Sequence, residues 1–132
     1  MPEKAGLPKP QGPYSLWVKA GGFVFISGQG PLDPTSGEVF LGDIAEQTRM
    51  TFDNIEAVLA DAGLSLADVV KTTVFLSNMG DFALMNEVYA GRFGATKPAR
   101  STVEVAALPL GFGVEIEAVA AVPGSGTEIV RS

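Results

Sequence analysis

The sequence of 132 residues predicts a single α+β domain with the element order β-β-α-β-α-β-β. Three observations lead to this fold class. Two segments repeat apolar residues every three or four positions, as amphipathic helices do. Five short segments are rich in β-branched and aromatic residues, which favour strands. Hydrophobic residues make up 46% of the chain and charged residues 18%, so the composition is that of a folded domain rather than a disordered segment.

The expected elements divide the chain into an arm, a core and a tail. The core spans residues 12–122. In chain order we expect an arm at 1–11, strands at 15–20 and 23–27, a loop at 29–42, a helix at 43–62, a strand at 69–76, a helix at 81–93, strands at 100–107 and 114–122, and a frayed tail at 123–132.

The first two strands are expected to form a hairpin. Branched and aromatic residues lie on both sides of Gly21 and Gly22, and a Gly-Gly pair is a strong signal for a tight turn. The residues that follow, up to Gly42, contain Asp33-Pro34 and a Ser-Gly pair, which indicate turns.

The first helix has clear signals at both ends. Asp43, with Glu46 three residues later, resembles a capping box in which Asp takes the place of Ser or Thr. Gly63 is well placed as the residue that follows the helix, where a left-handed backbone is common. Between these ends, apolar residues recur on one face.

The second half of the chain alternates strands with one helix. Residues 69–76 (VVKTTVFL) are dense in β-branched residues. Phe82, Met85, Tyr89 and Phe93 lie on one side of the second helix. The two last strands flank a turn-prone segment at 108–113, which contains proline and glycine.

The expected sheet has more apolar surface than its two helices can cover. Two amphipathic helices cover one face of a sheet. However, residues 69–76 present apolar side chains to both faces. Because an exposed apolar sheet face usually binds a partner, we expect a homo-oligomer.

The composition excludes several kinds of chemistry and of partner. The chain has no His and no Cys, which excludes a Ser-His-Asp triad, thiolate catalysis and imidazole- or sulfur-ligated metals. A net charge of −6 opposes non-specific binding to nucleic acid, so we do not expect nucleic acid as a partner. The apolar runs are too short to span a membrane, and the proline-rich start lacks the features of a signal peptide. We therefore expect a cytoplasmic protein.

The last two strands contain the polar residues that most need an explanation. Alternation places Arg100, Thr102 and Glu104 on one face of their strand, and Glu115 and Glu117 together on one face of the next. The functional hypothesis is an Arg fork for a substrate carboxylate and a Glu that holds a water molecule. The alternative is a set of cross-strand ion pairs on a solvated face.

Three further positions have a functional and a structural interpretation. Tyr14 follows a Gly-Pro pair, while Ser27 and Gly28 lie at the end of a strand, so hydroxyls and open backbone could meet a ligand there. The same residues are also ordinary turn formers. Asn86 lies within the apolar side of the second helix, and spacing does not decide between a site amide and a core polar group.

An ordered set of short motifs closely resembles the RidA family, also called YjgF or L-PSP. Residues 98–106 read PARSTVEVA and residues 114–118 read VEIEA. The other matching motifs, in the family's order, are GPY at 12–14, ISGQ at 26–29, GEV at 37–39, VKTTVF at 70–75, and Asp81-Phe82 followed by Asn86. The resemblance covers residues 12–122.

This resemblance implies both a fold and an activity. The fold is chorismate-mutase-like α+β, assembled as a homotrimer with three ligand sites between subunits. The activity is hydrolysis of the reactive imines 2-iminobutanoate and 2-iminopropanoate to 2-keto acids and ammonia. The implied ligand is thus a small 2-imino or 2-keto acid, and none of the implied steps needs a metal or a cofactor.

The resemblance also implies a role for each site residue. Arg100 binds the substrate carboxylate bidentately, and Glu115 orients and activates the attacking water. Tyr14 and Ser27 line the pocket, and Gly28 gives access to the backbone. The resemblance also places Asn86 and Thr102 at the ligand pocket. Many bacterial members have Cys where this chain has Thr102, so substrate preference is expected to differ there.

Two other functions compete with imine hydrolysis. Members of the family are also described as endoribonucleases and translation inhibitors, which the acidic charge and the lack of His disfavour. The second competing function is that of a non-catalytic paralogue, which only binds a 2-keto acid at Arg100. Glu115 is the one feature that favours turnover over binding.

Overall fold

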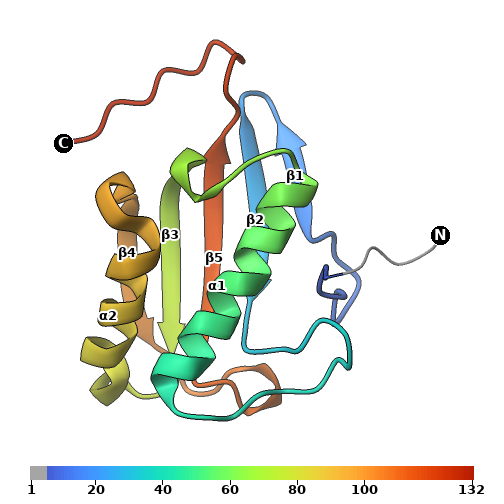
Figure 1. Ribbon diagram of the computed structural model, residues 1–132, viewed down its shortest axis with the longest axis vertical. Helices are drawn as coiled ribbons and strands as arrows, with labels where there is room; N and C mark the ends of the chain where they lie inside the picture. Colours follow the sequence, from blue (N-terminus) through green and yellow to red (C-terminus); the bar gives the residue numbers. More distant parts are fainter. Residues whose placement is uncertain (1–5) are drawn as a thin grey trace.

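The computed structural model describes residues 6–132 and contains five strands and two α-helices within that range (Figure 1). The strands are β1 (Trp17–Ala20), β2 (Phe23–Gln29), β3 (Val69–Leu76), β4 (Ala99–Glu104) and β5 (Val114–Ala121), and the helices are α1 (Ile44–Asp61) and α2 (Phe82–Phe93). The expected order β-β-α-β-α-β-β is confirmed. Part of the arm expected at 1–11 lies outside the described residues.

The five strands form one mixed sheet in the order β1-β2-β5-β3-β4. β3 and β4 pair in parallel, whereas the other neighbours are antiparallel. A parallel pair needs a crossover connection, and α2 supplies it between β3 and β4. β4 therefore forms one edge of the sheet, with α2 beside it.

Both helices pack on the same face of the sheet (Figure 1). The strand residues on that face alternate with residues on the other, so that Val114, Ile116 and Ala118 of β5 are buried while Glu115 and Glu117 point away. The buried residues of α1, among them Phe52 and Ile55, complete the core. We call this the helix face of the sheet and the opposite side the outer face.

The outer face carries the apolar side chains that the sequence predicts. Val18 is 52% exposed and Phe25, its pairing partner on β2, is 48% exposed. Val103 of β4 is exposed on the same face. This surface has the character of an interface.

The ends of α1 follow the capping signals. The Asp43 side chain accepts a hydrogen bond from the Glu46 N–H at 2.8 Å, which is the first bond of the expected capping box. Gly63 has φ +78°, a left-handed conformation that an L side chain rarely adopts. The Asp43 N-cap and the left-handed Gly63 are confirmed, whereas the second bond of a capping box, from the Asp43 N–H to the Glu46 side chain, is not among the hydrogen bonds of residues 6–132.

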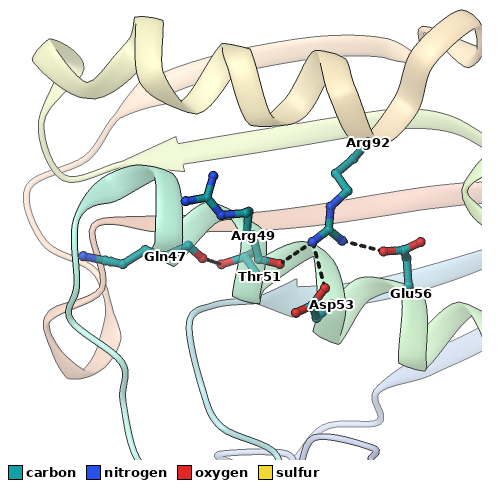
Figure 2. Close-up of polar contacts among 6 residues, drawn as sticks. All are labelled: Gln47, Arg49, Thr51, Asp53, Glu56 and Arg92. Atoms are coloured by element: carbon teal, nitrogen blue, oxygen red, sulfur yellow. Dashed lines mark hydrogen bonds and ion pairs between the residues drawn. The ribbon is translucent and has the colours of Figure 1, made fainter.

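One arginine joins the two helices on the surface (Figure 2). Arg92 of α2 donates to Asp53 at 2.8 Å and to Glu56 at 2.6 Å, and a third bond reaches the Arg49 carbonyl of α1. These contacts join α2 to α1 on the solvent-exposed side of the helix pair.

The structure corrects three expectations. β4 ends at Glu104 and not at residue 107, because the chain leaves the sheet after the Val105 N–H donates to the Leu76 carbonyl. The expected loop at 29–42 contains a small antiparallel bridge between Leu32 and Val39. The tail is not frayed, since the Arg131 guanidinium donates to the carbonyls of Ala67 and Val69.

Within residues 6–132, no helix combines the length and the apolar character that crossing a membrane requires.

Candidate functional site

Arg100 lies on the helix face of β4, where α2 holds its guanidinium. Nη1 donates to Oδ1 of Asn86 at 2.7 Å. The guanidinium carbon lies 4.7 Å from the centre of the Tyr89 ring and 5.6 Å from that of Phe82. Because Phe82, Asn86 and Tyr89 occupy positions i, i+4 and i+7 of α2, one helix face supplies all three contacts.

Tyr89 is in turn fixed by a strand residue. Its hydroxyl and the hydroxyl of Thr72 on β3 form a hydrogen bond of 2.6 Å in the protein interior. Burial raises the pKa of the Tyr89 hydroxyl above its usual range, although the Thr72 hydrogen bond and the Arg100 charge oppose the shift. The neutral ring therefore stays in place next to Arg100, and the cation is pre-oriented.

Thr102 and Glu104 follow Arg100 on the same face of β4. Glu104 accepts a hydrogen bond from the Met79 N–H at 2.7 Å, at the turn that leads into α2. The Thr102 hydroxyl is closed off from solvent, and within residues 6–132 it has no hydrogen-bond partner. The middle residue of this row therefore has an unused polar group.

Glu115 lies at a cavity of about 170 Å³ on the other side of the sheet. Tyr14, Gly28, Gln29 and the N-terminal residues Lys9 and Gln11 line this cavity together with the apolar Leu16, Leu32, Pro109 and Phe112. A Cβ added at Gly28 would lie 2.9 Å from the Glu115 carboxyl carbon, so the absence of a side chain at Gly28 makes room for the carboxylate.

The carboxylate is in an environment that disfavours its charge. Burial raises the pKa of Glu115 above its usual range, and the negative charge of Glu117 raises it further. A carboxyl group with a raised pKa in a small cavity can accept and return a proton near neutral pH more readily than an exposed one.

The remaining expected residues have local hydrogen bonds. The Tyr14 hydroxyl oxygen accepts from the Gln11 N–H at 3.0 Å while the side chain lines the Glu115 cavity. Ser27 donates to the Ser15 carbonyl at 2.6 Å and so ties the segment after the arm to β2.

Two buried amides of α1 fix the loops around this cavity. Asn54 donates to the carbonyls of Gly30 and Leu32. Gln47 donates to the Gly42 carbonyl and accepts from the Gly113 N–H. Both loops are thus attached to a rigid helix, which holds the cavity walls in position.

Within a single copy of the chain, the side chains of Arg100 and Glu115 lie apart. Thr72 of β3 pairs with both Arg100 and Ala118, and Ala118 lies on the helix face. Glu115 is three residues from Ala118, an odd number, so it points to the outer face. The alternative of a cross-strand ion pair between them is therefore excluded, since they lie on opposite faces with β3 in between.

Several residues that shape the site carry little signal in the sequence. The sequence pattern places Tyr89 and Phe82 only on the apolar side of their helix. The signal that could have indicated their contact with the Arg100 guanidinium is an Asn that lies between two aromatic residues on one helix face. Gln47 and Asn54 gave a weaker signal, as polar residues within the amphipathic pattern of α1. Nothing in the pattern indicated Phe112.

Comparisons with known proteins agree with the fold and the motifs. Residues 5–122 match the family described as Endoribonuclease L-PSP. The chain is 58% identical over 113 residues to a RutC family protein of Pyrococcus horikoshii, covering 86% of this chain and 90% of that protein. It is 47% identical over 112 residues to the 2-iminobutanoate/2-iminopropanoate deaminase of Escherichia coli K12, covering 83% and 87%. The structure of E. coli TdcF with bound serine superposes with a TM-score of 0.84 at 42% identity, covering 90% and 95%.

Proposed function

Because this chain belongs to the RidA/YjgF/L-PSP family, we propose that it hydrolyses 2-imino acids, with 2-iminobutanoate and 2-iminopropanoate as substrates, to 2-keto acids and ammonia. The main support for the proposal is that one chain contains two separate halves of a site, which we call half-sites. One half-site presents a pre-oriented cation, Arg100, and the other presents Glu115 at a small cavity.

In the proposed reaction, Arg100 binds the carboxylate of the imino acid. The guanidinium offers five N–H donors in a planar fork, and only Nη1 has a protein partner among the hydrogen bonds of the described residues. Asn86 therefore acts on the substrate through Arg100, by fixing the plane of the fork. A planar carboxylate can pair with two of the remaining donors.

Glu115 activates the water. Its carboxylate takes a proton from water as the water oxygen bonds to C2 of the imine, and it passes that proton to the nitrogen, which gives a carbinolamine. Glu115 then takes the proton of the new hydroxyl and passes it to the nitrogen as the C2–N bond breaks, so that ammonia leaves and the keto group forms. The bound imine is electrophilic, so positioning and proton transfer account for most of the expected acceleration. Tyr14 and Gly28 shape the cavity, Ser27 holds the adjoining segment, and Thr102 lies next to Arg100.

A second copy of the chain completes the site in this proposal. The two half-sites lie on opposite faces of one sheet, so a single ligand meets both only when they come from different copies. The exposed apolar side chains of the outer face, such as Phe25 and Val103, favour such an assembly. The assembly we propose is a homotrimer with three sites between subunits.

The test couples the protein to a threonine dehydratase, which releases the four-carbon imine, and follows the formation of 2-ketobutyrate. We expect the wild type to accelerate this step, and Arg100→Ala and Glu115→Gln each to lower kcat/KM by about a hundredfold or more. Arg92→Ala is the matched control. Like Arg100, Arg92 contacts an aromatic ring, and it pairs with protein carboxylates, but it lies away from both half-sites.

The other candidate functions give different results in the same experiments. No acceleration, with tight binding of 2-ketobutyrate that depends on Arg100, would mean a binding paralogue. Salt-dependent cleavage of RNA by a nuclease-free preparation would favour the endoribonuclease function. Full activity in Glu115→Gln would remove Glu115 from the proposed mechanism. Sedimentation of the same samples reports whether the assembly is a trimer.

A further inference from the structure

A second cavity, larger than the one at Glu115, lies under the C-terminal tail. Its volume is about 530 Å³, against about 170 Å³ for the cavity at Glu115. We call it the tail cavity. It lies at the end of the sheet where β3 and β4 begin and β5 ends. Glu115 is six residues from Ala121, the last residue of β5, which corresponds to about 20 Å along an extended strand. The two cavities are therefore separate, and the tail cavity has the size of pockets that hold small molecules.

The tail, residues 123–132, forms one wall of this cavity. After β5 it runs across the ends of the strands towards β4 and α2 (Figure 1). The Arg131 guanidinium anchors it by donating to the carbonyls of Ala67 and Val69, at the start of β3. This segment lies beyond residue 122, where the match to the family ends. The family resemblance therefore does not account for this wall.

The walls of the tail cavity are mainly apolar. The sheet side contributes Phe23, Val70, Pro98, Ala99 and Ala121, and the tail contributes Ile129 and Val130. Phe23 and Ile129 are both partly exposed to solvent across this space. An apolar group bound between the sheet and the tail would remove this surface from water, which is favourable.

Two cations line the tail cavity without a carboxylate partner in the described part of the chain. Within residues 6–132, the Lys97 ammonium makes no hydrogen bond and no ion pair. The Arg131 hydrogen bonds go to neutral carbonyls, which leave its charge uncompensated. Glu128 is the acidic side chain among the lining residues, so positive side chains are in excess. Such an excess attracts an anion.

The backbone of Lys97 adopts a conformation that costs free energy. Its φ is 41° and its ψ is 68°, which lies in the left-handed region that residues other than glycine and asparagine rarely adopt. Lys97 also precedes Pro98, and the residue before a proline is normally extended. Strained residues cluster at ligand sites. In this chain the strained residue is the one that brings an unpaired ammonium to the cavity.

We propose that the tail cavity binds a small amphipathic anion, with the anionic head at Lys97 and Arg131 and the apolar body between the tail and the sheet. A guanidinium offers a planar fork of donors and an ammonium offers a point charge, and both suit a carboxylate or a phosphate. The site uses neither Arg100 nor Glu115, so it does not depend on the proposed hydrolysis of imines.

Calorimetric titration of the full chain with octanoate and with octanamide tests the proposal, because the two ligands share an apolar body and differ in charge. We expect the wild type to bind octanoate about tenfold more tightly than octanamide. Lys97→Asn should abolish this difference by weakening octanoate alone. Its melting temperature should not fall, because asparagine tolerates the left-handed backbone better than lysine does. Lys97→Arg keeps the charge and should keep the preference for octanoate.

Three further variants serve as controls and locate the ligand. Lys19→Asn removes an exposed lysine that does not line the cavity, and it should leave both Kd values as in the wild type. Ile129→Ser removes an apolar side chain of the tail wall, and it should weaken both ligands about threefold. Arg100→Ala removes the other carboxylate-binding candidate and should leave the Kd for octanoate unchanged.

Several results would overturn the proposal. Loss of octanoate binding in Arg100→Ala would place the ligand at the half-site described above. Equal Kd values for octanoate and octanamide in the wild type would remove the role of the two cations. Unchanged binding in both Lys97→Asn and Ile129→Ser would place the ligand outside the tail cavity. A wild type that binds neither ligand would mean that the tail or a second copy of the chain fills the space.

Discussion

Replacing Tyr89 separates the two contacts that this side chain makes. Its hydroxyl bonds to Thr72 in the interior, and its ring lies 4.7 Å from the Arg100 guanidinium. Tyr89→Phe removes only the hydroxyl, whereas Tyr89→Leu removes the ring as well. Phe93→Leu is the control, since Phe93 packs against the Tyr89 and Phe52 rings but is not among the rings that contact Arg100.

The contacts of Tyr89 determine the expected changes in stability and in affinity. Thr72 is a buried residue, only 1% exposed, and Tyr89→Phe leaves its hydroxyl without its partner, so the free energy of unfolding should fall by about 1–2 kcal/mol. A cation–π contact of a half-buried arginine contributes about 1 kcal/mol, so losing it in Tyr89→Leu should weaken carboxylate binding about fivefold. Tyr89→Leu and Phe93→Leu should both destabilise the fold by about 2–3 kcal/mol.

Two assays test this separation. Urea denaturation gives the free energy of unfolding, and calorimetric titration with 2-ketobutyrate gives Kd under conditions in which every variant is folded. We expect Tyr89→Phe and Phe93→Leu to lose stability with a Kd close to that of the wild type. Only Tyr89→Leu should lose affinity. Wild-type affinity in Tyr89→Leu, or an equal loss in Phe93→Leu, would refute the idea that the ring positions Arg100.

Three further predictions concern Glu115 and the helix pair. Glu117→Gln removes a charge that raises the pKa of Glu115, so the acid limb of the kcat/KM profile should move to lower pH, because the carboxylate stays ionised further into acid; an unmoved limb would assign it to another group. Gly28→Ala places a Cβ 2.9 Å from the Glu115 carboxyl carbon, so kcat should fall about a hundredfold while the melting temperature changes little, as activity and thermal unfolding assays can show. Arg92→Met should lower the free energy of unfolding by about 1 kcal/mol, and this loss should shrink in 1 M salt if the ion pairs with α1 cause it.

The sequence by itself determined the element order and the face on which each strand residue lies. Apolar periodicity and capping signals are local, so Asp43 and Gly63 marked the ends of α1 correctly. Alternation along a strand is local as well, so it placed Arg100 with Thr102, and Glu115 with Glu117, on shared faces. The ordered motifs then indicated the family. The boundary of β4 was less accurate, because a strand ends where its neighbour stops pairing, and that depends on β3.

Only the tertiary structure decided how these faces relate to one another. That Arg100 and Glu115 lie on opposite sides of the sheet follows from the strand register, which no local pattern contains. The aromatic and amide contacts around Arg100 depend on how α2 packs over β4, and the lack of a partner for the Thr102 hydroxyl within residues 6–132 depends on every segment that surrounds it. The same holds for the tail, where Arg131 binds carbonyls more than sixty residues away. Contacts between distant segments are set by packing, and packing is a property of the whole folded chain.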